Sequence, residues 1–441
     1  MIRIDPIDRL RRPIDRFMEV QASGGILLLA ATLVALVWAN SPWRDVYHHL
    51  WDHSLAIRFD DYELRRTLHH WINDGLMAMF FFVVGLELKR EVVGGQLSKP
   101  SQAILPVAAG VGGMLFPATI YALVNGTAGA AADGWGIPMA TDIAFAVGVI
   151  AVLGSRVPTS LKIFLTTLAI ADDLGAVIVI ALFYTSDVSL INLGIGLGFL
   201  VVLIGGNRLG IRNPVFYGLF GIGGLWLAFL LSGVHATIAG VLAAFAIPAS
   251  VKIDEQGYIA RMQAQLDEFA RLAPNGVATL TEDQLHTIDE TDRLVRHAST
   301  PLQRLEHQLH PVVVYFVLPI FALANAGVEL PADVGSALAG PVALGVGLGL
   351  LVGKPVGILL VCWLTVRLGW ARVGEDFSWS QLAGVAFLAG IGFTMSLFIN
   401  ELAFENVALR QQAKLGVLVA SVLAGAVGYG VLRFASGPTQ R

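Results

Sequence analysis

Two adjacent aspartates, Asp172 and Asp173, lie in the middle of an apolar run that extends from Pro158 to Tyr184. The run is long enough to cross a lipid bilayer as one helix. An ionised carboxylate at mid-depth costs at least ~3 kcal/mol on insertion scales, and a neighbouring carboxylate adds repulsion. The pair therefore requires protons, a counter-charge or a bound cation. A site that holds either protons or a cation can exchange one for the other.

Neighbouring positions on an α-helix are ~100° apart, which leaves two interpretations of the pair. In the first, Asp172 and Asp173 form one shared site for the cation and the protons. In the second, one aspartate binds the ion and its neighbour has a structural role. We favour the shared site because polar groups at this depth in a membrane are usually functional.

Two other apolar segments are interrupted by glycine and proline. The first covers residues 134–143, and the second, residues 389–396, includes Gly390 and Gly392. They belong to the second of three spans in each of two triplets along the chain. Interrupted segments at corresponding places in two halves of a transporter indicate a binding site that is built from broken helices.

The ends of a broken helix each carry roughly half a unit of charge and need compensation. Thr141 and Asp142 lie in the first interruption, and Lys354 stands between glycine and proline in another apolar run. We expect Asp142 to face the positive half-helix ends and Lys354 the negative ends. The alternative, that Asp142 and Lys354 are only structural charge partners, stays open.

The composition indicates a membrane protein with many spans. Of the 441 residues 55% are hydrophobic and 14% are charged, and the mean hydropathy is +0.69. Soluble chains carry about 25% charged residues. The net charge of −4 gives no indication of nucleic-acid binding, and the single cysteine, Cys362, excludes an internal disulfide and a thiolate metal cluster.

Apolar runs predict an all-α polytopic membrane protein with about twelve transmembrane helices. The predicted spans are residues 24–39, 72–88, 103–124, 137–153, 158–184, 190–206, 214–232, 234–248, 311–328, 340–366, 380–400 and 414–432. Most of the 29 Lys and Arg residues fall in the segments that are cytoplasmic if both termini are cytoplasmic. The long basic lead before the first run favours a membrane span over a signal peptide.

Four regions follow from this pattern. Residues 1–20 are a cytoplasmic N-terminal segment, 21–250 hold spans one to eight, 251–310 form a cytoplasmic helical insertion, and 311–441 hold spans nine to twelve and a short cytoplasmic C-terminus. Alternating residues at about 54–67 predict a small outer β-hairpin. Its unpaired edges indicate a contact between two protomers.

Several motifs together resemble the NhaA-type bacterial sodium/proton antiporters, which are known for interrupted helices of this kind. The motifs are Gly85–Glu91, Ala140–Ala146, Ala171–Gly175, Ser232–Thr237, Arg304–His307, Gly353–Pro355 and Gly390–Ser396. The resemblance runs from about Asp15 to the end of the chain. It implies twelve helices with inverted three-helix repeats, crossing of interrupted spans four and eleven, and a homodimer in the bacterial inner membrane.

The resemblance also implies electrogenic exchange of two protons inward for one Na⁺ or Li⁺ outward, which provides sodium and pH homeostasis. It assigns the ion and proton site to Asp172 and Asp173, with Asp173 the more direct ligand of Na⁺. It also implies a charge-balancing role for Lys354, through a pairing with Asp172. No cofactor is expected beyond the transported Na⁺, Li⁺ and H⁺, and the partners are these ions and the lipid bilayer.

The family's pH response corresponds to four residues of this chain. They are Glu87, Glu91, His235 and Glu306. An interfacial salt-bridge cluster is the plainer interpretation of Glu87 and its charged neighbours, and a hydrogen-bonded structural histidine is the plainer interpretation of His235. The loop before the Arg304–His307 motif is longer than we expect for the family.

Three other classes of protein place acidic residues in a membrane. An intramembrane aspartyl protease draws its two aspartates from two helices, whereas those of this chain are adjacent. A cation channel fits interrupted helices in paired triplets less well than alternating access does. The nearest alternative is a symporter of an organic anion with sodium, which a substrate-dependent sodium current would reveal. The sequence therefore predicts a transporter and not an enzyme.

Overall fold

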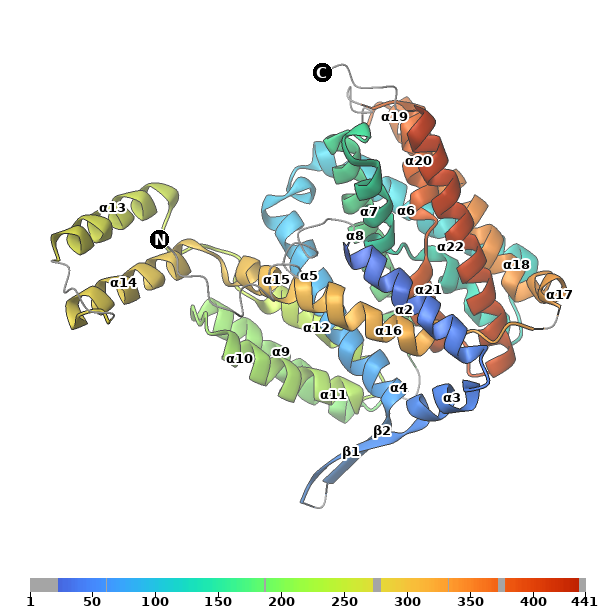
Figure 1. Ribbon diagram of the computed structural model, residues 1–441, viewed down its shortest axis with the longest axis horizontal. Coiled ribbons are helices and arrows are strands. Elements are labelled where there is room, and N and C mark those ends of the chain that lie inside the picture. The colour runs from blue at the N-terminus through green and yellow to red at the C-terminus, as the bar shows by residue number, and fades with distance from the viewer. Residues whose placement is uncertain are drawn as a thin grey trace.

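The computed structural model describes residues 23–60, 62–185, 188–272, 279–331, 333–371 and 377–435. The described chain is mostly helical, with one two-stranded sheet. Most helices pack into one bundle, from which the sheet and the helix pair α13–α14 project in different directions (Figure 1). The predicted mostly helical fold with a small β-hairpin is confirmed. The predicted N-terminal segment, residues 1–20, lies outside the described residues.

The described part of the first half holds two strands and eleven α-helices. They are α2 (Ser23–Ala39), α3 (Arg44–Asp52), β1 (Ser54–Phe59), β2 (Tyr62–Thr67), α4 (Leu68–His70), α5 (Met77–Gly94), α6 (Pro100–Asn125), α7 (Ile143–Leu153), α8 (Thr159–Phe183), α9 (Leu190–Arg208), α10 (Pro214–Gly218), α11 (Leu227–Leu230) and α12 (Ala236–Ala246). Wider helical turns at Trp71–Leu76 and Leu219–Trp226 join α4 to α5 and α10 to α11. A tighter helical segment, Ala132–Met139, precedes α7.

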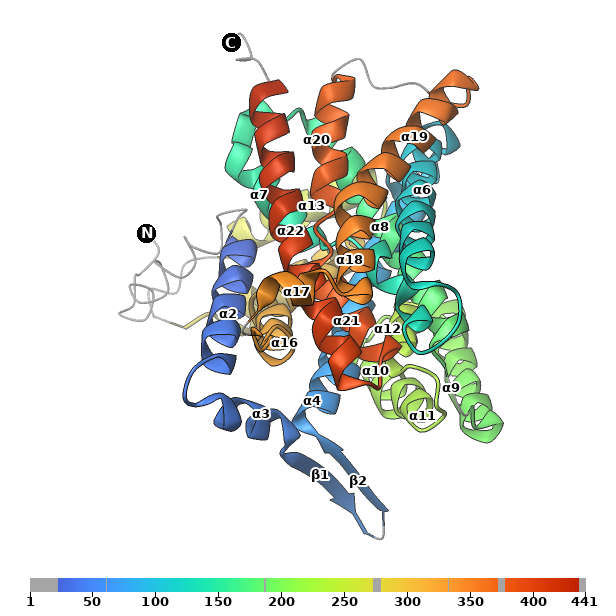
Figure 2. The same cartoon turned by 90° about the vertical axis from the view of Figure 1, so that its right-hand side faces the viewer.

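The second half is helical. Its helices are α13 (Glu255–Arg271), α14 (Glu282–Ala298), α15 (Pro301–Val312), α16 (Leu318–Asn325), α17 (Val334–Leu338), α18 (Pro341–Leu348), α19 (Lys354–Arg367), α20 (Trp379–Ala389), α21 (Phe393–Ala403) and α22 (Val407–Ala435). Helical turns at Val313–Val317 and Gly349–Gly353 continue α15 into α16 and α18 into α19. Figure 2 shows α20 and α22 side by side in the bundle.

Seven helices of the described residues are long and apolar enough to cross a membrane. They are Pro100–Asn125, Ala132–Arg156, Thr159–Phe183, Leu190–Arg208, Pro301–Asn325, Pro341–Arg367 and Val407–Ala435. The number rises to nine if two bent pairs each form one span, namely α2 with α3 at 113° and α20 with α21 at 42°. The chain is thus a multi-pass membrane protein. Twelve spans, and the inverted repeats among them, stay predictions.

Helices of the bundle approach closely where both contribute glycine. A Cβ on Gly112 of α6 would lie 2.5 Å from the carbonyl oxygen of Gly357 on α19, and Gly357 faces Gly112 in the same way. On α5, a Cβ on Gly85 would lie 2.8 Å from Ala244 of α12. Small residues at such crossings let membrane helices gain van der Waals contact without side chains between them.

The hairpin formed by β1 and β2 projects from one end of the bundle (Figures 1 and 2). The strands pair antiparallel, with Ser54 opposite Thr67 and Ile57 opposite Leu64. Asp60 in the turn has a positive φ of 53°, a conformation that aspartate tolerates better than most residues. Leu55 and Ile57, two residues apart on β1, are 51% and 56% exposed. This face of the hairpin therefore presents two exposed apolar side chains, next to Arg66, which lies opposite Leu55.

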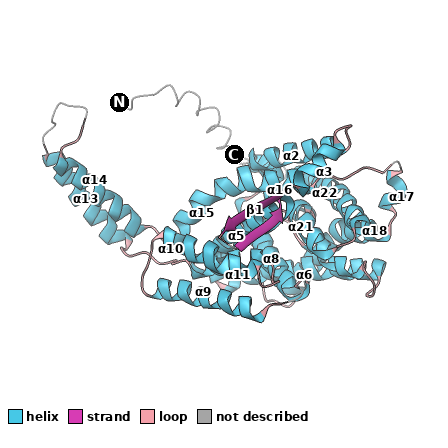
Figure 3. Ribbon diagram, turned by 90° about the horizontal axis from the view of Figure 1, so that it is seen from below, coloured by secondary structure: helices cyan, strands magenta, loops and turns pink. Residues whose placement is uncertain are grey.

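The predicted insertion forms a helical hairpin of α13 and α14, which lies outside the bundle in the view of Figure 3. Asp254 caps α13 by accepting a hydrogen bond from Gly257, and Thr281 begins α14 with a reciprocal capping box. The next helix, α15, begins at Pro301 and continues into the bundle. The predicted end of the insertion at residue 310 therefore lies within a helix.

Candidate functional site

The two predicted interruptions lie against each other at the centre of the bundle. The chain leaves helical geometry between Met139 and Ile143, and again between Ala389 and Phe393. The backbone N–H of Asp142 in the first break donates to the carbonyl oxygen of Ile391 in the second at 2.6 Å. This bond satisfies backbone groups that neither broken helix satisfies by itself.

The second break requires glycine because the chains approach so closely there. A Cβ on Gly390 would lie 2.6 Å from the carbonyl oxygen of Leu350. A Cβ on Gly392 would overlap Ser396 and lie 3.2 Å from the carbonyl oxygen of Ala140 in the first break. A larger residue at Gly392 would push the second break away from the first, and one at Gly390 would push it away from Leu350.

Asp142 meets the positive ends of both broken helices. Its Oδ1 accepts from the backbone N–H of Phe145 at 3.1 Å, which caps α7. Its Oδ2 accepts from the backbone N–H of Thr394 at 2.9 Å and from the Thr394 hydroxyl at 2.6 Å, at the start of α21. One buried carboxylate thus caps two helix N-termini, where the helix dipoles favour negative charge.

The negative ends of the broken helices meet two donors. The Lys354 ammonium donates to the carbonyl oxygen of Met139, the last residue of the helical segment before the first break. The Thr141 hydroxyl lies 2.9 Å from the carbonyl oxygen of Ala389, the last residue of α20. These contacts have the signs that the helix dipoles require.

Lys354 and Thr141 also join the breaks to the aspartate pair on α8. The Lys354 Nζ forms an ion pair with Asp172 Oδ2 at 2.8 Å, and both side chains are fully buried. The Thr141 hydroxyl lies 2.7 Å from the same Asp172 oxygen. Because a hydroxyl has one hydrogen, Thr141 cannot donate to Asp172 and to Ala389 at once.

Asp172 and Asp173 each have an oxygen without a partner. Both residues are buried, and the Oδ1 atoms of both lack a hydrogen-bond partner among the described residues. Beside Asp172 lies Gly110 of α6, where a Cβ would be 3.3 Å from Oδ1. Buried carboxylate oxygens ordinarily have partners, so these two atoms are the polar groups that a proton or a cation would satisfy.

Asp173 is set in a negative environment. The charges of Asp172, Asp142 and Glu87 act on it, and the positive charge of Lys354 opposes them. Since Lys354 is already paired with Asp172, the three acidic groups leave an excess of negative charge around Asp173. Such an excess favours a bound proton or a bound cation.

Three of the four predicted pH-responsive residues lie near one another at the C-terminal end of α5. Arg90 forms ion pairs with Glu306 of α15 and, at 3.2 Å, with Glu91. The charges of Glu306, Arg90 and Glu91 all act on Glu87. Lys89 donates to the carbonyl oxygen of Phe245 at 2.6 Å and so caps the end of α12. The arrangement is a salt-bridge cluster that joins α5 to α15.

His235 lies away from this cluster. It precedes the first residue of α12, whereas Lys89 contacts the last turn of that helix. The eleven residues of α12 correspond to about 16 Å. The His235 ring nitrogen lies 2.6 Å from the carbonyl oxygen of Tyr184 at the end of α8. The structure therefore brings His235 next to the aspartate helix but not next to Glu87, Glu91 and Glu306.

Several polar residues of the site did not stand out in the sequence. Thr394 and Ser396 each lie within a motif, yet only the structure reveals that Thr394 binds Asp142 and that the Ser396 hydroxyl donates to the carbonyl oxygen of Ile137 at 2.7 Å. A second ionic cluster centres on buried Glu401, which pairs with Lys414 at 2.7 Å and with Arg410 at 3.2 Å. The sequence signal that could have revealed this cluster is a carboxylate, Glu401, at the end of an apolar run, followed by the cations Arg410 and Lys414.

We expect replacement of Asp142 by alanine to destabilise the protein more than replacement by asparagine. Alanine leaves the N–H groups of Phe145 and Thr394 buried without an acceptor, and each such group costs about 1–3 kcal/mol. Asparagine keeps one acceptor oxygen but loses the charge. The unfolding free energy of purified protein in mixed micelles checks this order. Equal stability of the two variants would contradict the capping role.

Comparison with known proteins identifies the family to which the chain belongs. Residues 15–432 match the family model described as Na+/H+ antiporter 1. The chain is 50% identical over 428 residues to Na(+)/H(+) antiporter NhaA 2 of Syntrophotalea carbinolica, with 97% of each protein covered. It is 50% identical over 429 residues to Na(+)/H(+) antiporter NhaA of Oleidesulfovibrio alaskensis, covering 97% of this chain and 95% of the relative. It is also 47% identical over 427 residues to the NhaA antiporter of Koribacter versatilis. These relatives are transporters and not enzymes, and the chain belongs to the NhaA family of sodium/proton antiporters.

Proposed function

We propose that this protein exports Na⁺ or Li⁺ in exchange for about two protons, and that Asp172 and Asp173 bind both. The observation that carries the proposal is the pair of buried Oδ1 atoms without a partner, one on each aspartate. With both aspartates ionised and Lys354 protonated, the three groups carry one net negative charge. A bound Na⁺ neutralises that charge, and so does a proton, so the two compete for the same state of the site.

The electrical consequence follows from the stoichiometry. Two protons inward for one sodium outward move one net charge inward in each cycle. A membrane potential of 100 mV then contributes ~2.3 kcal/mol to sodium export, which corresponds to a roughly fifty-fold gradient. If Lys354 stays protonated throughout, Asp172 and Asp173 take the two protons. If Lys354 is instead neutral in the sodium-bound state, Asp173 and Lys354 take them, and one net charge still moves inward.

We place alternating access at the two breaks. In the proposed twelve-span architecture with inverted repeats, these breaks interrupt spans four and eleven. Support comes from Thr141, whose hydroxyl lies within hydrogen-bonding distance of both Asp172 and the carbonyl oxygen of Ala389. With Asp172 ionised, Thr141 donates to it. With Asp172 protonated at Oδ2, the carboxyl group donates to Thr141, which then donates to Ala389. Proton binding on α8 would thereby change a contact at the end of α20.

Acid is expected to suppress exchange because protons compete with Na⁺ for the aspartates. We assign a further pH response to Glu87, Glu91 and Glu306, whose shared partner Arg90 links α5 to α15. Protonation of either carboxylate partner of Arg90 would weaken that link. His235 would contribute separately, through its contact with the end of α8.

The protein would act in the bacterial inner membrane, with both termini and the insertion on the cytoplasmic side. Sodium and pH homeostasis are the expected roles there. The distribution of Lys and Arg along the chain supports this orientation. No cofactor is required for exchange of this kind, because the side chains bind the transported ions directly.

We also propose that the β1–β2 hairpin joins two protomers. Its free strand edges and its exposed Leu55 and Ile57 support this role. Replacing both residues by lysine is expected to lower the fraction of dimer, because charge is disfavoured in an apolar contact. Size-exclusion chromatography with light scattering measures the mass of the protein in detergent.

In the matched control variant, two exposed apolar residues of the insertion are replaced by lysine instead of the two hairpin residues. Ile259 and Leu266 of α13 are 56% and 60% exposed, similar to the hairpin residues. The control variant, with both replaced by lysine, should keep the mass of the unmodified protein. A dimer that resists the hairpin substitutions would remove the hairpin from the interface.

Purified protein in liposomes tests the exchange itself. The vesicles hold a trapped pH dye and an imposed inward-acid gradient, and Na⁺, Li⁺ or K⁺ is added outside over a series of pH values. Na⁺ and Li⁺ should collapse the gradient and K⁺ should not. A folded protein that leaves the gradient intact at every pH would rule out antiport and favour sodium-coupled uptake of an organic solute.

A further inference from the structure

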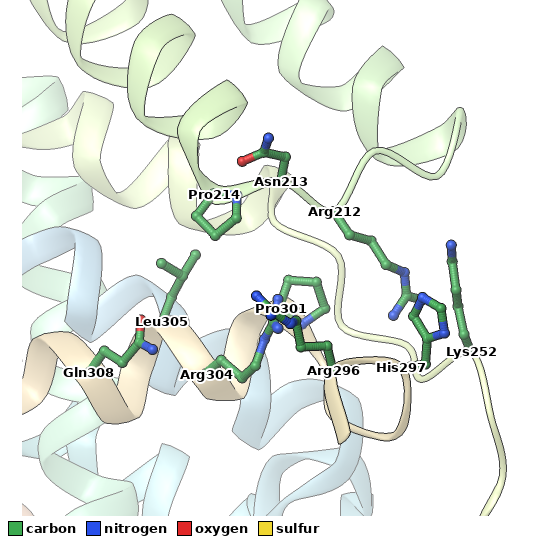
Figure 4. Close-up of a pocket in the computed structure, with 10 residues that line it drawn as sticks. All are labelled: Arg212, Asn213, Pro214, Lys252, Arg296, His297, Pro301, Arg304, Leu305 and Gln308. Atoms are coloured by element: carbon green, nitrogen blue, oxygen red, sulfur yellow. The ribbon is translucent and has the colours of Figure 1, made fainter. Parts of the chain in front are cut away.

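A pocket of about 420 Å³ lies where the helical insertion joins the bundle (Figure 4). Its walls are the α9–α10 loop, the segment before α13, the end of α14 and the first turns of α15. The volume falls within the roughly 300–1,000 Å³ that is typical of sites for small ligands. None of the residues that line the pocket belongs to the two breaks or to the aspartate pair.

The pocket is strongly positive. Arg212, Lys252, Arg296 and Arg304 line it together with His297, and no carboxylate does. Of these four cations, only Arg296 has an ion pair within the described ranges, with Asp292 one turn earlier on α14. Three cations therefore face a shared space without a counter-charge from the part of the chain that the structure describes.

Two of the arginines present buried nitrogens that nothing satisfies. Arg212 Nη1 and Arg304 Nε are buried and have no hydrogen-bond partner among the described residues. Arg212 is held in place because its other terminal nitrogen, Nη2, donates to the carbonyl oxygen of Ser250 at 2.7 Å. Burial lowers the pKa of Arg212, and the positive charge of Arg304 lowers it further. Buried cationic nitrogens without acceptors are unfavourable, and an anion would satisfy both.

The insertion contributes the opposite wall. The backbone N–H groups of Lys252 and Ile253 both donate to the carbonyl oxygen of His297, at 2.9 and 3.3 Å, which joins the start of the insertion to its end. Figure 4 shows Arg212 extending toward His297, with Lys252 beside the histidine. Burial lowers the pKa of His297, as do the charges of Lys252 and Arg212. In either protonation state the His297 ring carries at least one N–H that can donate to a ligand.

We propose that this pocket binds a phosphate-bearing anion and that the bound anion ties the insertion to the bundle. Guanidinium groups bind phosphate oxygens through paired, charge-assisted hydrogen bonds, and lysine adds a point charge. Arg212 and Arg304 come from the bundle side, whereas Lys252, Arg296 and His297 come from the insertion. The phosphate belongs either to a soluble phosphorylated molecule or to the headgroup of an anionic lipid, because both present the same oxygens.

The test uses the full chain and two matched double variants. Lys252→Gln with Arg304→Gln removes two pocket cations, whereas Arg261→Gln with Arg271→Gln removes two exposed cations of α13 that do not line the pocket. Inorganic pyrophosphate is titrated into detergent-solubilised protein in a calorimeter. In parallel, the thermal midpoint is measured in nanodiscs of phosphatidylcholine with and without phosphatidylglycerol. Lys252→Gln alone is included because Lys252 is exposed and has no ion pair in the described chain, so that variant should fold.

Binding of pyrophosphate that weakens about tenfold or more in the pocket variant, and not in the α13 variant, establishes a soluble phosphate ligand. Stabilisation by phosphatidylglycerol alone, with the same dependence on the variants, establishes a lipid headgroup. Lys252→Gln should give a smaller loss of the same kind. Equal losses in both double variants would mean that only overall charge matters, and binding of neither probe would exclude a phosphate site; both results overturn the proposal.

Discussion

Asp173→Asn is expected to abolish sodium-dependent proton movement in liposomes while the protein keeps its fold. The substitution preserves the shape of the side chain and removes a charge that has no ion pair within the described residues. Loss of a charged ligand from a buried site costs about 3 kcal/mol or more, which lowers the exchange rate at a given sodium concentration about a hundredfold or more. The dye assay across a pH series measures this directly.

The same assay on Asp172→Asn separates the two members of the pair. This variant should also be silent, but it leaves the buried Lys354 ammonium without its carboxylate. Its unfolding free energy should therefore fall, whereas that of Asp173→Asn should not. The two variants should therefore differ in unfolding free energy, although neither should exchange sodium for protons.

Asp333→Asn is the matched control for both variants. Asp333 is exposed and caps the short helix α17, a position where asparagine serves as well as aspartate. Exchange and stability should both be retained. If Asp173→Asn kept the sodium response of the unmodified protein, the ion would bind elsewhere and Asp172 would be the single functional member of the pair.

Local sequence patterns predicted the elements that depend on local rules. The alternation on both sides of Asp60 predicted the hairpin, and helical spacing predicted α13 and α14. Glycine and proline marked the first break and glycine the second, each to within a few residues. At the second break, close backbone approach restricts the residue type to glycine. Each of these features follows from residues that are near one another in the chain.

Contacts between residues that are distant in the sequence were harder to predict. The family resemblance suggested the pairing of Lys354 with Asp172, but it did not reveal that Lys354 also binds Met139. The bond from Thr394 to Asp142 spans 252 positions, and a threonine in an apolar run gives no sign of its partner. Likewise, the four pH-response residues carried no information about which helix end each occupies, so the separate position of His235 emerged only from the packing of α5 with α12.

Lys354→Met should cause a large loss of stability. Methionine fills the space of the four-atom lysine stem, but Asp172 then becomes a buried charge without a partner and Met139 loses its donor. Breaking a buried pair in this way costs about 3–5 kcal/mol. The measurement is the unfolding free energy in mixed micelles for Lys354→Met, Asp172→Asn and the double variant.

The double variant decides what Lys354 does for the fold. If its main role is to neutralise Asp172, then Lys354→Met with Asp172→Asn should recover part of the stability, because no unpaired charge is left at that position. Double-mutant coupling between contacting groups is typically about 0.5–3 kcal/mol. The recovery should be incomplete, since the carbonyl oxygen of Met139 still lacks its donor at the negative end of the broken helix. Strictly additive losses would instead mean that Lys354 stabilises the break alone, and the charge-pair account of the site would have to be given up.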